Sequence, residues 1–148
     1  MPLCPVLYSR YPSGGHSTNS LSETYKTTDW KDEKHVPVIG APLAVKKGTV
    51  VPVPVTIGKE VAHPNTTAHH IAWIALYFQP AGSPVPYEIG RVEFKAHGAS
   101  AEGADKSGVY THHEVTMKLK TELSGTLMAT SYCNIHGLWQ STQVLAVE

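Results

Sequence analysis

The sequence predicts an all-β fold, an immunoglobulin-like β-sandwich of seven strands, preceded by an N-terminal extension. Three observations predict this class. Short β-type runs, broken by Gly, Pro and Asn, follow one another from about residue 30 to the C-terminus. No segment has the apolar periodicity of an amphipathic helix. The length of 148 residues is that of a single domain. We therefore expect one sandwich domain over residues 29–148.

The seven expected strands differ in how their apolar residues are spaced. Residues 48–58 carry apolar side chains at odd positions and prolines at 52 and 54, which predicts an edge strand. Residues 70–78 are apolar on both faces and predict a buried central strand. Residues 108–120 end in an alternation of apolar and polar side chains, typical of a half-buried strand. The runs lie at 35–42, 48–58, 70–78, 87–94, 108–120, 125–133 and 141–148.

The composition excludes several classes of protein and partner. Lys+Arg and Asp+Glu are equal at 12 each, so the chain lacks the basic footprint of a nucleic-acid binder. We find no apolar run long enough to cross a membrane and no signal peptide, so we expect a cytoplasmic protein without a membrane partner. Residues 1–28 are rich in Ser, Thr, Gly, Tyr and Pro, and we expect them to be irregular. Cys4 in this extension and Cys133 are expected to be free thiols or ligands.

Nine histidines gather mostly in three clusters at the ends of expected strands, in residues 32–39, 60–74 and 131–139. The third cluster also holds Cys133, three residues before His136. Imidazole and thiolate are good ligands for iron, copper and zinc. A single nearby cysteine excludes a four-thiolate site, and the Cys-x-x-Cys-His motif of c-type haem attachment is absent. These clusters therefore predict a metal site of one thiolate and several imidazoles.

Strand parity narrows the choice among these residues. His69 and His70 are consecutive, so their side chains point to opposite faces and only one of them can share a metal with His63. Parity favours His69, and His70 is expected to be a hydrogen-bonding neighbour. If the chain is extended near residue 34, Glu33 and His35 lie on the same face. A carboxylate and an imidazole would then approach one metal together.

Three segments resemble the iron-binding motifs of superoxide reductases, the family that includes the neelaredoxins and the C-terminal domain of desulfoferrodoxins. They are Glu33-Lys34-His35, His63-Pro64 with five residues between His63 and His69, and Cys133-Asn134-Ile135-His136-Gly137-Leu138-Trp139. The resemblance runs from about residue 30 to the C-terminus, with the motifs in the family's order and spacing. It implies the same seven-stranded sandwich.

The resemblance also implies a site and a reaction. The site would be a mononuclear non-haem iron with an axial thiolate from Cys133 and equatorial ligands from His35, His63, His69 and His136. Glu33 would be the sixth ligand of the oxidised iron, and Lys34 would assist the reaction with superoxide. The reaction would be the one-electron reduction of superoxide to hydrogen peroxide, with an electron donor such as rubredoxin. Relatives suggest a homo-oligomer, a dimer or tetramer. The four-cysteine second iron centre of some members is not expected, because residues 1–29 offer only Cys4.

Two other functions are compatible with the sequence. A blue-copper electron carrier is also a β-sandwich with Cys and His close together in a C-terminal loop, and Gln140 would have to supply its weak axial ligand. That hypothesis leaves Glu33, Lys34 and His35 unexplained. A sandwich that only binds protein partners would hold no metal.

Overall fold

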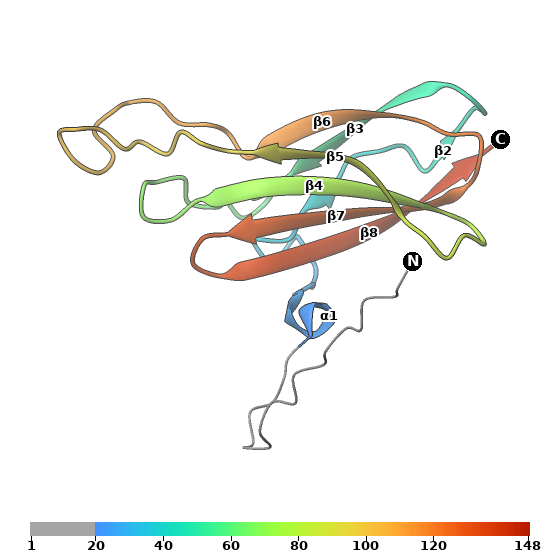
Figure 1. Ribbon diagram of the computed structural model, residues 1–148, viewed down its shortest axis with the longest axis horizontal. Helices are drawn as coiled ribbons and strands as arrows, with labels where there is room; N and C mark the ends of the chain where they lie inside the picture. Colours follow the sequence, from blue (N-terminus) through green and yellow to red (C-terminus); the bar gives the residue numbers. More distant parts are fainter. Residues whose placement is uncertain (1–19) are drawn as a thin grey trace, which may run out of the picture.

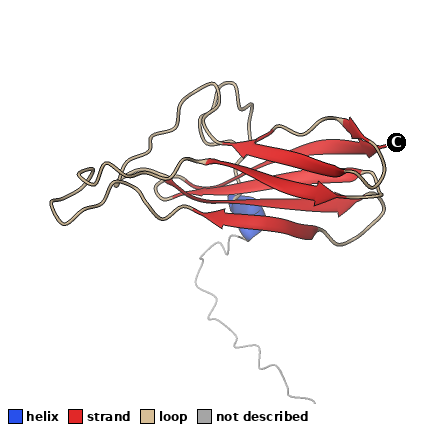
Figure 2. Cartoon of the chain, turned by 90° about the horizontal axis from the view of Figure 1, so that it is seen from above, coloured by secondary structure: helices blue, strands red, loops and turns tan. Residues whose placement is uncertain are grey.

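Two β-sheets packed face to face form the body of the protein, as the computed structural model shows for residues 20–148 (Figure 1). One sheet has the strand order β1-β3-β6 and the other β2-β8-β7-β4-β5. Figure 2 shows the two layers from above, with almost all regular structure in strands. The elements are α1 (Leu21–Thr24), β1 (Val38–Ile39), β2 (Ala44–Val45), β3 (Val50–Thr56), β4 (Ile71–Pro80), β5 (Tyr87–Glu93), β6 (Glu114–Lys120), β7 (Gly125–Cys133) and β8 (Gly137–Val147).

The hydrophobic core fills the space between the two sheets. The odd-numbered valines 51, 53 and 55 of β3 point into it, as their alternation with proline predicts. Ile74 and Leu76 of β4 meet them from the other sheet and are fully buried. Burial of such side chains contributes about 1.5–3 kcal/mol each. The predicted central strand is confirmed, because β4 lies between β5 and β7.

The predicted β-sandwich is confirmed, and each of the seven expected runs contains a strand. An eighth strand, β2, was not expected. It has only two residues, which pair in parallel with Ala146 and Val147, and two residues are too few to show a periodicity. The predicted edge position of β3 is wrong, because β3 lies between β1 and β6. The prolines are tolerated because β1 pairs only with Val55 and Thr56, so Pro52 faces no partner on that side.

The described part of the N-terminal extension is more regular than predicted. Residues 21–24 form one helical turn, and the Ser20 N–H donates to the Glu23 carboxylate at 2.8 Å across its start. Lys26 then forms a parallel bridge to Trp139. The earlier residues of the extension, Cys4 included, lie outside the described residues. No helix within residues 20–148 is long and apolar enough to cross a bilayer.

Antiparallel pairing brings three separate segments to one end of the sandwich. They are the segment just before β1, the loop from β3 to β4, and the turn from β7 to β8. These three segments contain the three histidine clusters of the sequence. The same end carries the long loop between β5 and β6, which extends away from the body at the left of Figure 1.

Candidate metal centre

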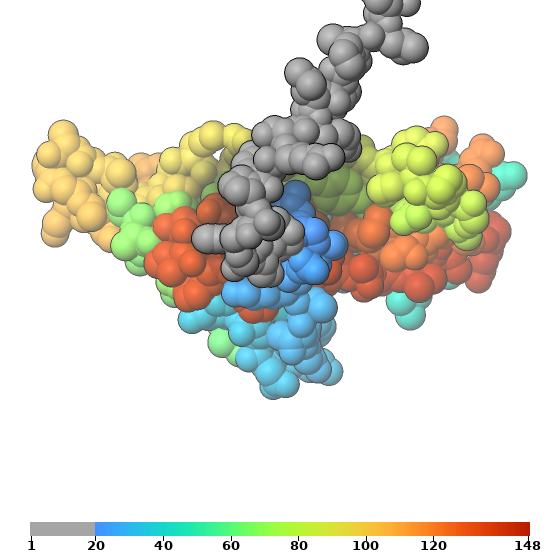
Figure 3. All heavy atoms as spheres, turned by 60° about the horizontal axis from the view of Figure 1, so that its bottom comes forward, coloured from blue at the N-terminus to red at the C-terminus, as the bar shows by residue number. Residues whose placement is uncertain are grey.

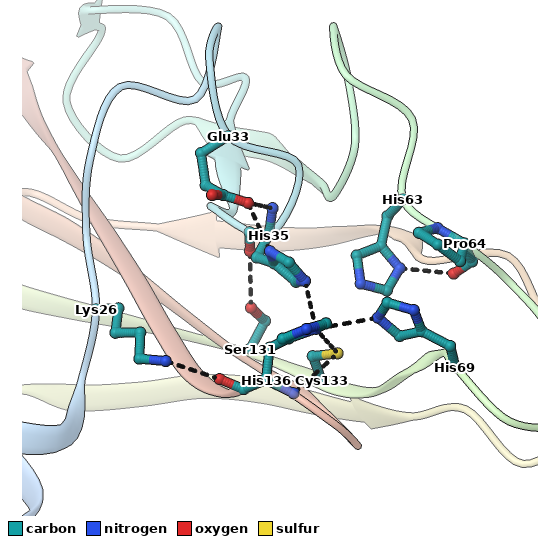
Figure 4. Close-up of polar contacts among 9 residues, drawn as sticks. All are labelled: Lys26, Glu33, His35, His63, Pro64, His69, Ser131, Cys133 and His136. Carbon is teal, nitrogen blue, oxygen red and sulfur yellow. Dashed lines mark hydrogen bonds and ion pairs between the residues drawn. The ribbon is translucent and has the colours of Figure 1, made fainter.

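Four potential ligand atoms meet at this end of the sandwich. They belong to His35, His69, Cys133 and His136, and all lie within 4.8 Å of one another. His136 Nδ1 is 3.0 Å from His35 Nε2, 3.2 Å from His69 Nε2 and 3.6 Å from Cys133 Sγ. Figure 4 shows these side chains pointing toward a common centre from three segments of the chain. The predicted convergence of the three clusters is therefore present.

His63 stands beside this group. Its ring centroid lies 4.8 Å from those of both His35 and His69. Its Nδ1 contacts the Pro64 carbonyl at 2.6 Å, so Nδ1 carries the proton and Nε2 keeps a free lone pair. Nε2 is buried and has no hydrogen-bond partner. Because an unpartnered buried polar atom is costly, this nitrogen is suited to a ligand that the protein itself does not supply.

Glu33 determines which nitrogen of His35 faces the centre. Its Oε1 accepts from His35 Nδ1 at 2.5 Å and from the His35 backbone N–H at 3.2 Å. His35 therefore presents the lone pair of Nε2 to the other ligand atoms, an arrangement common around metal-bound histidines. The carboxylate contacts the outer nitrogen of the ring in this structure, so the predicted sixth-ligand role requires it to leave His35.

Burial favours the neutral form of three of these imidazoles, those of His35, His63 and His69. It lowers the pKa of His63 to about 3 and lowers the pKa of His35, where the Glu33 carboxylate opposes the shift. The pKa of His69 is lowered by burial first and then by the charges of His136 and Lys34. The pKa of Glu33 is lowered: burial raises it, but the hydrogen bonds from His35 outweigh that effect. Neutral imidazoles offer the lone pairs that a metal requires.

Cys133 is the last residue of β7, and its side chain is fully buried. The backbone N–H of His136 donates to its sulfur at 3.4 Å. The tight turn that returns His136 to the same centre requires a left-handed residue, and Gly137 supplies it with φ of 80°. Turn geometry therefore explains why a Cys-x-x-His-Gly sequence can place sulfur and imidazole together.

Asn134 joins two of the ligand segments, a role that the sequence alone did not predict. Its Oδ1 accepts from the His70 N–H at 2.8 Å, and its Nδ2 donates to the Ala68 carbonyl at 2.9 Å. Its own N–H donates to the His70 carbonyl at 3.1 Å. These bonds hold the segment of His69 against the turn of Cys133 and His136. The only sequence feature that pointed to this role was the position of an asparagine next to a ligand cysteine. Its hydrogen-bond partners could not be predicted, because they are far away in the chain.

Other histidines and a tryptophan surround the centre. His70 contacts the Thr66 carbonyl through Nδ1 at 3.0 Å and stacks on His97, which agrees with its expected hydrogen-bonding role. His113 is 7% exposed, and its ring lies 5.6 Å from that of His63. Trp139 stacks on His35 at 4.9 Å with an interplanar angle of 13°. The site is therefore enclosed on its inner side, whereas His136 is exposed to solvent.

The residues present fit a metal ion. Neighbouring ligands of one ion at a bond length of roughly 2.1 Å lie about 3 Å apart, which is the spacing observed around His136 Nδ1. One nitrogen cannot satisfy three such neighbours by hydrogen bonding, because a neutral imidazole carries a single N–H. A cation among these lone pairs resolves the conflict and also provides a partner for His63 Nε2.

Fold and donor set together define a β-sandwich protein with a histidine- and cysteine-ligated metal site at one end. The family model described as desulfoferrodoxin matches residues 27–142. A putative superoxide reductase of Thermotoga maritima is 57% identical over 86% of this chain and 98% of its own length. The superoxide reductase of Pyrococcus furiosus is 52% identical over 84% of this chain and 98% of its own. The chain belongs to the desulfoferrodoxin family.

The solved structures agree with this assignment. The crystal structure of the Thermotoga maritima putative superoxide reductase superposes with a TM-score of 0.86 at 56% identity, covering 88% of this chain and 98% of that one. The family-model match over residues 27–142 includes all three ligand segments. The predicted domain boundaries, 1–28 and 29–148, stay predictions.

Proposed function

We propose that this protein is a superoxide reductase that reduces superoxide to hydrogen peroxide at a mononuclear iron. The iron would be held by four imidazoles and one sulfur, those of His35, His63, His69, His136 and Cys133. The observation that carries the proposal is the convergence of three imidazole nitrogens and one sulfur, with the unpartnered Nε2 of His63 beside them. The named superoxide reductases at about half identity support the same reaction.

The donor set favours iron over the blue-copper alternative. A blue-copper site uses two histidines, one cysteine and a weak axial ligand, which leaves two of the imidazoles at this centre without a role. Gln140 would have to be that axial ligand. Successive residues of a strand point to opposite faces, and Trp139 is the residue of β8 that packs on His35. The Gln140 side chain therefore lies on the other face of β8.

The residues at the open side of the centre suit a small anionic substrate. A ferrous ion held here supplies one electron, and two protons complete the conversion of superoxide to hydrogen peroxide. Lys34 is close enough for its charge to lower the pKa of both His35 and His69. The same positive charge attracts superoxide and accelerates the encounter in a salt-dependent way. On the inner side, the buried sulfur of Cys133 would be a ligand of the iron and would donate electron density to it.

Glu33 acts after the product has left. Its carboxylate lies one hydrogen bond away from the centre, on His35 Nδ1, and 30% of its side chain is exposed. With oxidised iron bound, Glu33 would be its sixth ligand, and its negative charge would balance the additional positive charge. With reduced iron bound, Glu33 would remain on His35.

The electron donor is a small iron–sulfur protein of the rubredoxin type, and the enzyme is a cytoplasmic dimer or tetramer. These assignments rest on the resemblance of the site motifs and remain predictions. Size-exclusion chromatography with light scattering tests the oligomer, and reduction of the oxidised enzyme by purified rubredoxin tests the donor.

Metal analysis and superoxide consumption test the proposed function. The protein purified from cells grown with iron should contain one iron per chain. It should consume superoxide with formation of hydrogen peroxide but without the dioxygen that dismutation releases. The Cys133→Ser and His136→Ala variants should lose the thiolate-to-metal absorption band. Stoichiometric copper would instead support the electron carrier, and full metal retention in the Cys133→Ser/His136→Ala double variant would exclude this site.

A further inference from the structure

Lys26 connects the N-terminal segment to the metal-binding turn. Its backbone N–H donates to the Leu138 carbonyl at 3.0 Å, and its carbonyl accepts from the Gln140 N–H at 2.9 Å. These bonds add a short parallel partner to the edge of β8, immediately after His136. Figure 3 shows this part of the chain, in blue, lying against the red segment that contains the turn. The position of Lys26 is therefore held by backbone bonds on both sides.

The side chain of Lys26 contacts the supports of two proposed ligands. Its Nζ donates to the carbonyl of His136 at 3.3 Å, as Figure 4 shows. The same ammonium lies 5.5 Å from the ring centroid of Trp139, within the range of a cation–π contact. Trp139 in turn stacks on His35. One cation thus touches the backbone of one ligand and the ring that packs on another.

Among residues 20–148, no carboxylate forms an ion pair with Lys26 that would cancel its positive charge. Its two contacts, a carbonyl oxygen and an aromatic face, keep the ammonium beside the metal-binding turn. A fixed positive charge there disfavours the more positive oxidised centre relative to the reduced one.

We propose that Lys26 is a positioning residue of the metal centre, which holds the His136 turn and Trp139 in place and whose charge favours the reduced state. The part concerning the reduced state rests on the proposed iron function. The positioning part applies to any metal that these ligands hold, because it concerns only the geometry of His136 and His35.

Two measurements on the full chain separate the positioning role from the charge. Lys26→Met keeps the length of the side chain and removes its charge and hydrogen bond, whereas Lys26→Arg keeps both. Lys31→Met is the matched control, because Lys31 also lies over a tryptophan, Trp30, at 5.8 Å. The half-time of zinc loss to a chelator measures positioning. The midpoint potential of the iron-loaded protein measures the charge.

Lys26→Met should lose zinc about tenfold faster, at the lower end of the effect of residues that support metal ligands. Its midpoint potential should fall, and the fall should shrink at high salt. Lys26→Arg and Lys31→Met should match the parent in both measurements. Any other pattern overturns the proposal, including a Lys26→Arg variant that behaves like Lys26→Met. Lys26→Gln replaces Lys26→Met if the latter does not fold. Because zinc retention requires no redox chemistry, its outcome is independent of the proposed function.

Discussion

Replacing Glu33 tests whether a carboxylate outside the centre controls the affinity of the site for its metal. Glu33 Oε1 accepts two hydrogen bonds from His35, one from Nδ1 at 2.5 Å and one from the backbone at 3.2 Å. In Glu33→Ala both bonds are lost, and His35 is free to rotate or to protonate Nε2 instead. In Glu33→Gln the side-chain oxygen remains as an acceptor. The two variants therefore differ in how well they orient His35.

The expected loss of metal affinity follows from the free energy of the hydrogen bond that is lost. A hydrogen bond to a charged group contributes about 1.5–3 kcal/mol, and the 30% exposure of the Glu33 side chain favours the lower end. A loss of about 1.4 kcal/mol corresponds to a tenfold weaker affinity. We expect Glu33→Ala to bind Fe(II) about tenfold more weakly than the parent, and Glu33→Gln only about two- to threefold more weakly.

Anaerobic competition with a chromophoric chelator measures this affinity without relying on activity. An alanine variant within twofold of the parent would refute the reasoning, as would a glutamine variant as weak as alanine. The oxidised protein supplies a separate observation. Neither variant offers a carboxylate as sixth ligand, so the absorption spectrum of the oxidised form should change in both.

Three further predictions concern the surroundings of the centre. Lys34→Ala should slow the second-order reaction with superoxide by about tenfold at low salt and flatten its salt dependence, as measured by pulse radiolysis; an unchanged rate would remove its steering role. Asn134→Ala should weaken metal binding by roughly tenfold, measured by chelator competition, since it frees the His69 segment from the Cys133 turn. Burial lowers the pKa of His113 to about 4, so the unfolded chain binds a proton that the folded chain excludes between pH 6.5 and 4. The metal-free parent should therefore lose roughly 3 kcal/mol more unfolding free energy than His113→Asn as the pH falls through that window, measured by urea unfolding; parallel curves would contradict this.

The sequence supports the fold and the candidate residues to different degrees. The alternation of Val51, Val53 and Val55 and the apolar run of β4 predict the two layers and the central strand, because burial of one or both faces has a clear periodic signature. The two-residue strand β2 has no such signature. The sheet position of β3 also could not be predicted, because it depends on how few of its residues β1 covers.

The metal site, like the fold, was predicted from the sequence only in part. The three clusters predict which residue types form the metal site and the order in which they occur in the chain. Strand parity favours His69 over His70 as the ligand. The contacts of Asn134 and Lys26 were not predicted, because each joins positions far apart in the chain. Their effect depends on the turn and strand pairing that bring those positions together.

The sequence by itself determined the sandwich class and the donor chemistry of this protein, one thiolate among several imidazoles, because local periodicity and residue type are properties of short segments. Only the tertiary structure decided which nitrogen of His35 and of His63 faces the centre, that Glu33 lies on the outer nitrogen of His35, and that Lys26 contacts the His136 carbonyl. The physical reason is that hydrogen-bond partners orient an imidazole, and those partners are set by packing between distant segments.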